Sequence, residues 1–142
     1  MIGGGTGGFT PPDPRGIFGE EKAVLEWSAT KLSRAIHARN VAPSEVMAAW
    51  LARVAEVNGA VNAVISLREP DALMAEARAL DDVQPSGWLH GIPFAVKDLV
   101  ATKGLRTTWG SPLFAGHVPA ADDLIAARLR AAGGLFIGKT NT

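Results

Sequence analysis

The sequence predicts an α/β fold, in which helices and short buried strands alternate along the chain. Four segments carry apolar residues at the three- and four-residue spacing of amphipathic helices. Three short apolar runs, at about 61–67, 92–97 and 135–138, are too short for helices and read as strands. Glycine and proline clusters separate these segments. Together they indicate a layered domain built from helices and a sheet.

The composition is that of one globular domain. The chain has 142 residues, of which 47% are hydrophobic and 20% are charged. Lys and Arg number 14 and are balanced by 14 Asp and Glu, so the basic excess of a nucleic-acid surface is absent. No apolar run approaches the ~20 residues that span a bilayer, and the N-terminus has no signal-peptide pattern. We therefore expect a cytoplasmic protein with neither nucleic acid nor membrane as a partner.

The residues that usually hold metals and cofactors are scarce. Cysteine is absent from the chain, which excludes disulfides, thiol catalysis and thiolate metal sites. The histidines, His37, His90 and His117, are far apart and lack the spacing of a metal-binding motif. We expect no metal and no cofactor.

The chain divides into a leader, residues 1–27, and a domain, residues 28–142. Residues 1 to about 19 are rich in glycine and proline, which predicts a flexible segment. Its run GGGTGG resembles a phosphate loop only in composition. Neither a preceding strand nor a directly following helix is predicted there, so a flexible tail is the preferred interpretation.

The first half of the domain is mainly helical. Ser28 is placed to cap a helix that runs to about Arg39. A second helix begins at Pro43 and ends near Asn58-Gly59. A strand is predicted at about 61–67. Pro70 then opens a third helix, which the sequence QPSG interrupts.

The second half places a strand on each side of a loop and a helix. The strand at about 92–97 leads into a Gly/Thr-rich loop that reaches residue 119. Asp122 is predicted to cap the next helix, which Gly133 ends in a left-handed conformation. A final strand, LFIG, follows, and no helix is left to cover it. We therefore expect an incomplete α/β domain with an unpaired sheet edge that favours self-association or a complementing chain.

The segment GGLFIGKT, residues 133–140, satisfies the pattern of a nucleotide-binding P-loop. A P-loop follows a strand, opens as a loop around phosphate and leads into a helix. Here a predicted helix precedes Gly133, and the intervening residues favour a strand. We expect a false match, which leaves a nucleotide-binding domain as the least favoured alternative.

Lys97 lies at the end of the strand in HGIPFAVKDLV and admits two interpretations. One places its amine in water beyond the strand's end. The other places it among apolar groups, where loss of hydration would lower the pKa of a lysine and allow it to act as a general base or nucleophile. Asp98 is a poor direct partner for Lys97, because neighbours on a strand point to opposite faces.

Several stretches, taken together, resemble the first part of the amidase signature family. They are GIPFAVKD, TTWGS, DDLIAARLRAAGGLFIGKTN and the lead-in APSEVMAAWLARVAEVNGAVNAVI, in matching order over about residues 28–142. The resemblance implies a mixed β-sheet flanked by helices, here as an incomplete amidase-signature fold. It also implies hydrolysis or transfer of amides by a serine, a second serine on a cis peptide and a lysine. That lysine maps onto Lys97, which would exchange protons with the bridging serine.

Other residues of the matching stretches receive structural interpretations. In the family both serines and the oxyanion hole belong to a Gly/Ser-rich stretch after GKTN, so no serine of this sequence takes either role. Ser111 is expected to cap a loop or line a pocket, and Lys139 to be structural. Backbone geometry explains Gly133 and Gly138.

The sequence therefore predicts a C–N bond hydrolase by resemblance, which is inactive alone because only Lys97 of the Ser-cisSer-Lys triad is present. Its partner would be a small-molecule amide, provided that the missing part completes the site. The alternative is a non-catalytic binding or assembly module derived from an amidase.

Overall fold

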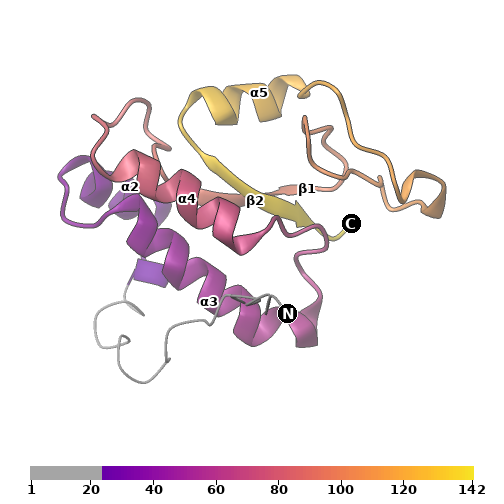
Figure 1. Ribbon diagram of the computed structural model, residues 1–142, viewed down its shortest axis with the longest axis horizontal. Coiled ribbons are helices and arrows are strands. Elements are labelled where there is room, and N and C mark those ends of the chain that lie inside the picture. Colours follow the sequence, from indigo (N-terminus) through magenta and orange to yellow (C-terminus); the bar gives the residue numbers. More distant parts are fainter. Residues whose placement is uncertain (1–23) are drawn as a thin grey trace, which may run out of the picture.

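The computed structural model describes residues 24–142, which form three layers. In Figure 1, α5 covers one face of a two-stranded sheet, and α3 and α4 lie on the other. The elements in chain order are α2 (Ala29–His37), α3 (Pro43–Val61), α4 (Pro70–Asp81), β1 (Pro93–Lys97), the 3₁₀-helix η1 (Pro112–Phe114), α5 (Leu124–Ala131) and β2 (Leu135–Thr140). The α/β expectation is confirmed.

The two strands are parallel, and their carboxyl ends meet at one edge of the sheet. Pro93 pairs with Leu135 at one end and Lys97 with Thr140 at the other. The register shifts after Phe94, so that Ile137 has no partner residue on β1. Parallel strands need a crossover connection, and the loop and α5 between β1 and β2 provide it.

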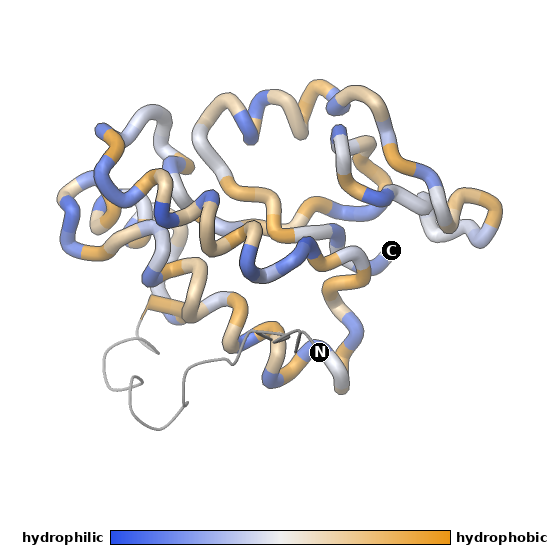
Figure 2. Tube along the Cα trace, in the orientation of Figure 1, coloured by the Kyte–Doolittle hydropathy of each residue, from blue (hydrophilic) through white to orange (hydrophobic). Residues whose placement is uncertain are grey.

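The core has a cluster on each face of the sheet and a third beside α2. Between the sheet and α3 and α4 lie Met47, Leu51, Val54, Leu73, Ala77 and Ile137. Between the sheet and α5 lie Val96, Leu105, Ala126 and Phe136. The third cluster consists of Leu32, Ile36, Val41, Val46, Leu89 and Ile92. Figure 2 shows the apolar stretches of the strand region between the helices that cover them.

The predicted helix starts at Ser28 and Pro43 are confirmed. The Ser28 hydroxyl accepts a hydrogen bond from the Lys31 N–H at 3.2 Å, which caps α2. Pro43 is the first residue of α3, and the Glu45 carboxylate accepts from the Ala42 N–H at 2.7 Å. Both starts follow from local chemistry, which explains why the sequence alone located them.

The predicted cap at Asp122 is wrong by one residue, because Asp123 is the residue that precedes α5. Neither carboxylate caps the helix. Asp122 accepts from the Lys103 N–H, and Asp123 accepts from the Ala101 N–H, both at 2.7 Å. The two aspartates thus hold the start of the loop that follows β1.

The predicted strand at 61–67 is also wrong, because α3 continues to Val61 and ends at Asn62 in a left-handed conformation. The segment after it still follows β2. Val64 forms one antiparallel bridge with Thr140, and Ile65 donates to the Lys139 carbonyl. The Asn58 side-chain amide donates to the Val64 carbonyl and accepts from the Val64 N–H, both at 2.8 Å, and the Ile65 carbonyl accepts from the Arg106 guanidinium at 3.2 Å.

The Gly/Pro-rich part of the expected leader, including GGGTGG, lies outside the described residues. Within residues 24–27, Val24 and Trp27 pack against the cluster beside α2. In the part of the chain that the structure describes, no helix is long and apolar enough to cross a membrane.

Candidate active site

Lys97 is the last residue of β1 and lies at the edge where both strands end. Its side chain is exposed, and its amine donates to the Asn141 carbonyl at 3.4 Å. The described residues therefore place Lys97 as the first interpretation does, beyond the strand's end and in contact with water. The described residues do not enclose the Lys97 amine among apolar groups, as the second interpretation would require. The catalytic role of Lys97 therefore stays a prediction.

Asp98, the next residue, is fully buried and fixes the TTWGS loop beside Lys97. Its carboxylate accepts from the Thr108 N–H at 3.0 and 3.1 Å and from the Thr108 hydroxyl. Its own N–H donates to the Thr140 carbonyl at 3.1 Å, which joins the ends of the two strands. One buried carboxylate thus sets the position of this loop relative to the sheet.

Arg106 holds the other side of the same loop. Its guanidinium donates to the Ser66 hydroxyl and the Ile65 carbonyl, each at 3.2 Å, and to the Ala115 carbonyl at 3.4 Å. Because one planar group reaches three acceptors on two segments, it ties the loop to the segment that runs beside β2.

The loop beyond Thr108 carries an aromatic group on the surface. Trp109 stacks on His117 with ring centroids 4.9 Å apart, and Phe114 meets the indole edge-on at 5.0 Å. Ser111 caps η1 by accepting from the Leu113 N–H at 3.3 Å, as expected for a loop-capping residue. The Leu113 side chain itself is 91% exposed. The loop that Asp98 holds through Thr108 therefore carries an exposed apolar surface.

The buried lysine of this region is Lys139 in β2, not Lys97. Its amine donates to the Thr102 hydroxyl at 3.0 Å and to the Val100 carbonyl. Burial lowers the pKa of Lys139 from its usual value, and the charge of Asp98 opposes that shift. The structural role that the sequence suggests for Lys139 fits these contacts.

The segment 133–140, which satisfies the P-loop pattern, does not have the geometry of a P-loop. Residues 135–140 form β2 rather than an open loop, and α5 precedes Gly133. The Lys139 amine is bound inside the protein, where it cannot reach a phosphate outside. The strand predicted for this segment is confirmed, and the nucleotide-binding alternative loses its structural basis.

The site brings together the end of β1, the end of β2 and the TTWGS loop. Within residues 24–142, no serine or threonine hydroxyl hydrogen-bonds to the Lys97 amine. No group of three or more His, Asp or Glu side chains in these residues could hold a metal ion. The sequence interpretation missed Asp98, Thr108 and Arg106 as the residues that position the loop. The only sequence signal for these positioning residues was a charged residue in the apolar run, Asp98, with a hydroxyl residue, Thr108, ten positions later.

Comparisons with known proteins agree on one family. The family model described as Amidase matches residues 45–142. The acylamidase of Rhodococcus erythropolis is 38% identical over 123 residues, which cover 83% of this chain and 26% of the acylamidase. One component of the glutamyl-tRNA(Gln) amidotransferase of Thermus thermophilus is 46% identical over 101 residues, which cover 71% of this chain and 20% of that component.

A solved structure shares the fold. Native peptide amidase from Stenotrophomonas maltophilia matches with a TM-score of 0.73 and 31% identity, over 82% of this chain and 25% of the peptide amidase. The chain thus spans about a quarter of the length of the relatives it matches.

Proposed function

Because this chain belongs to the amidase family, we propose that it is the part of an amide-cleaving enzyme that supplies the catalytic lysine, Lys97. The proposed substrate class is an amide. Relatives are named acylamidase, peptide amidase and fatty acid amide hydrolase, which have the amide bond in common. The other three quarters of such an enzyme would supply the remaining groups.

The observation that carries the proposal is the place of Lys97 at the carboxyl end of β1. The lysine is the last residue of a strand whose end adjoins the end of β2 and the TTWGS loop. The carboxyl ends of strands in α/β folds are where substrates usually bind. Among the described residues its amine hydrogen-bonds only to the Asn141 carbonyl, and its side chain is exposed, which leaves it accessible to a hydroxyl from another segment.

The proposed chemistry follows the serine–serine–lysine scheme of the family. As the nucleophilic serine oxygen bonds to the amide carbon, its proton passes through the bridging serine to the Lys97 amine. The same proton returns to the departing nitrogen when the C–N bond breaks, which leaves an acyl ester on the serine. Water then cleaves the ester with proton transfers in the same relay, and releases a carboxylate.

This scheme implies that the chain alone is inactive. Removing one member of a catalytic unit typically costs several powers of ten in rate, and an absent oxyanion hole costs ~10²–10³ more. Lys97 without a bound serine has no proton to relay. Activity would appear only when a polypeptide with the family's Gly/Ser-rich segment packs against this edge.

The exposed apolar surface supports a second candidate, a non-catalytic assembly module. Leu113, Val118 and Phe114 are 91%, 52% and 43% exposed and lie in one loop. Such a surface is typical of an interface. The same surface suits contact with the rest of an amidase, so binding alone does not separate the two candidates, whereas turnover does.

The experiment measures ammonia release from a panel of primary amides. We expect none from the purified chain. We expect turnover after addition of the complementary part of the Rhodococcus erythropolis acylamidase, beginning after the region that matches this chain. Amide hydrolysis by the chain alone would contradict the proposal. A stable complex that shows no turnover would favour the assembly module.

A further inference from the structure

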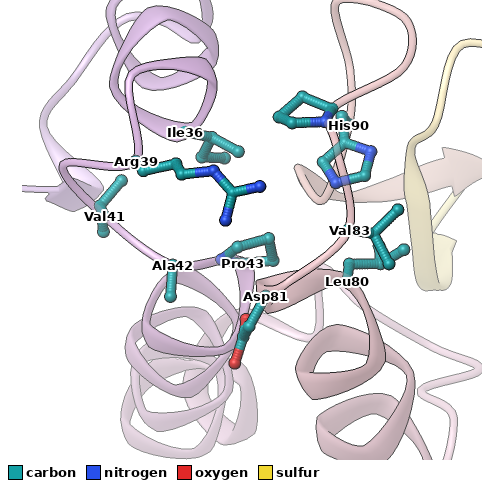
Figure 3. A pocket seen from close by; sticks show the side chains of 10 residues that line it. Ile36, Arg39, Val41, Ala42, Pro43, Leu80, Asp81, Val83 and His90 are labelled. Atoms are coloured by element: carbon teal, nitrogen blue, oxygen red, sulfur yellow. The ribbon is translucent and has the colours of Figure 1, made fainter.

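The cavity shown in Figure 3 lies apart from the elements that carry Lys97. Its walls come from the end of α2, the start of α3 and the segment after α4. Among the described residues, none that lines it belongs to β1, β2 or the TTWGS loop. A substrate held at Lys97 would therefore meet the loop residues rather than this cavity.

The turn at residues 108–111 of the TTWGS loop has two consecutive residues in the left-handed region. The Ser111 N–H donates to the Thr108 carbonyl at 2.9 Å, which closes the turn. The central residues, Trp109 and Gly110, have φ angles of 49° and 71°. Such turns strongly prefer Asn or Gly at these positions, and a positive φ is an outlier for a bulky residue. The backbone of this turn therefore explains Gly110 but not Trp109.

Packing of the indole at most balances the backbone strain at Trp109. Strain of this kind disfavours a conformation by a factor of about 5–150. The indole stacks on His117 and meets Phe114 edge-on, and each aromatic pair favours the conformation by a factor of about 2–12. Because the two pairs leave no surplus, stability does not account for a tryptophan here. Strained residues of this kind cluster at active sites and ligand clamps.

The same turn lies against the segment that follows β2, next to Lys97. A Cβ atom on Gly110 would lie 2.8 Å from the Thr142 hydroxyl oxygen. The preceding residue, Asn141, accepts from the Lys97 amine through its carbonyl at 3.4 Å. In Figure 1 the loop between β1 and α5 and the C-terminus lie at the same end of the molecule. The hydrogen bonds of Asp98 to the first residue of the turn hold it there.

The surface around Trp109 is apolar and open. Trp109 and Phe114 are 36% and 43% exposed, and Leu113 is 91% exposed. The Arg106 guanidinium of the same loop is already engaged by three acceptors, the Ser66 hydroxyl among them. The surface therefore suits an uncharged planar group, since aromatic rings pack favourably on one another beyond the area they bury.

We propose that Trp109 is a specificity-determining residue of the amide site, and that its indole packs against an aromatic ring on the carbonyl side of the amide. The preferred substrates are then aromatic primary amides rather than short aliphatic ones. This inference rests on the proposed function, because it takes Lys97 as the group beside which the amide is cleaved. The strained backbone at Trp109 presents the indole at the surface of the turn that adjoins Lys97.

The first test needs no turnover and uses the full 142-residue chain. The ¹H and ¹⁵N NMR signals of the indoles are followed during titration with benzamide and with cyclohexanecarboxamide, which has a similar size but no aromatic ring. We expect saturable shifts at Trp109, with cyclohexanecarboxamide binding about 2–12-fold more weakly. Trp88, 57% exposed in the segment after α4, is the internal control and should not shift. Absence of a shift at Trp109, equal shifts at Trp88, or equal binding of the two amides would overturn the proposal.

Trp109→Asn removes the ring and keeps the turn, because Asn adopts a positive φ readily. It identifies the Trp109 indole signal and should abolish the preference for benzamide over cyclohexanecarboxamide. Its melting temperature should stay within about 4 °C of the parent. A larger fall would show that the indole serves packing and would overturn the proposal.

The second test uses the reconstituted enzyme. The ratio of kcat/KM for benzamide to that for acetamide should fall about 2–12-fold in Trp109→Asn and stay at the parent value in Trp88→Asn. An unchanged ratio in Trp109→Asn would overturn this inference and leave the proposed function standing. Turnover in no combination, or full turnover by Lys97→Ala, would instead refute the proposed function, and the titration would still decide whether Trp109 binds aromatic amides.

Discussion

The carboxylate of Asp98 accepts hydrogen bonds from both the backbone N–H and the hydroxyl of Thr108, ten residues later in the chain. Asp98 directly follows Lys97, and Thr108 belongs to the TTWGS loop. Because Asp98 is fully buried, water cannot replace these bonds. This pair therefore determines where the loop lies relative to the Lys97 amine.

Replacing Asp98 should loosen the loop and destabilise the chain. For Asp98→Ala we expect the free energy of unfolding to fall by about 2–3 kcal/mol, since hydrogen bonds to a buried charged group are lost. Amide hydrogen exchange at Thr108 should accelerate. Thr108→Ser retains the hydroxyl and is the matched control, with a smaller loss. Unchanged exchange at Thr108 in Asp98→Ala would show that other contacts fix the loop.

The buried Lys139 should give the stability a distinctive dependence on alkaline pH. Burial lowers its pKa below the usual 10.5 in the folded chain. As the pH rises between the lowered pKa and 10.5, the unfolded chain still binds this proton while the folded chain has released it. Stability attributable to Lys139 therefore increases with pH in this window.

Lys139→Met tests this, because it removes the amine and keeps a long apolar side chain. The rise in unfolding free energy with alkaline pH, measured by urea denaturation at several pH values, should be smaller in this variant. Lys103→Met, at an exposed lysine, is the control and should retain the parent slope. Identical slopes in all three proteins would rule out a lowered pKa at Lys139.

Asp122 should contribute to stability in the opposite pH range. The Arg130 guanidinium, which donates to its carboxylate at 2.9 Å, lowers the pKa of Asp122 below 3.8 with help from the Lys103 N–H, while burial opposes the shift. The folded carboxylate thus stays ionised to lower pH than the unfolded one. Its stabilisation is complete well above pH 3.8 and is lost as the pH falls through the folded-state pKa.

We expect Asp122→Asn to lower the free energy of unfolding at neutral pH by about 1 kcal/mol. The difference between parent and variant should shrink on acidification and vanish at the lowest pH that both tolerate. A difference that is constant across pH values would assign the effect to packing rather than to charge.

Gly138 in β2 should not tolerate a side chain. A Cβ atom there would lie 2.5 Å from the Ser66 carbonyl oxygen and 3.0 Å from Leu67 Cα, both backbone atoms that cannot move easily. Thermal denaturation of Gly138→Ala should reveal a loss of about 1–3 kcal/mol. Gly59→Ala is the matched control, because nothing lies within 4 Å of its added methyl group. Gly59 lies in the last turn of α3, where this change should add up to about 0.5–1 kcal/mol.

The parts of the fold that the sequence predicted are those with local causes. Ser28 and Pro43 begin helices through their own chemistry, and the short apolar runs became β1 and β2. The run at 61–67 failed because α3 continues to Val61 and side chains bond the backbone after it. The Asn58 amide bonds both backbone groups of Val64, and the Arg106 guanidinium donates to the Ile65 carbonyl. No apolar pattern records such bonds.

The site was predictable only in part for the same reason. The sequence located Lys97 at a strand end, and the structure agrees. It did not reveal which lysine is buried, because that depends on the loop that returns Val100 and Thr102 over β2. The same physical argument that made Lys97 conspicuous, an ammonium among apolar residues, applies in the folded chain to Lys139.

The most direct test of the proposed function compares two lysine variants in the reconstituted enzyme. The chain is combined with the complementary acylamidase part, and the rate of ammonia release is measured for parent, Lys97→Ala and Lys103→Ala. Loss of a general base typically costs about 10²–10⁴-fold, so Lys97→Ala should lose that much while Lys103→Ala retains the parent rate. Turnover by Lys97→Ala at the parent rate would contradict the assignment of Lys97 as the proton-transfer group.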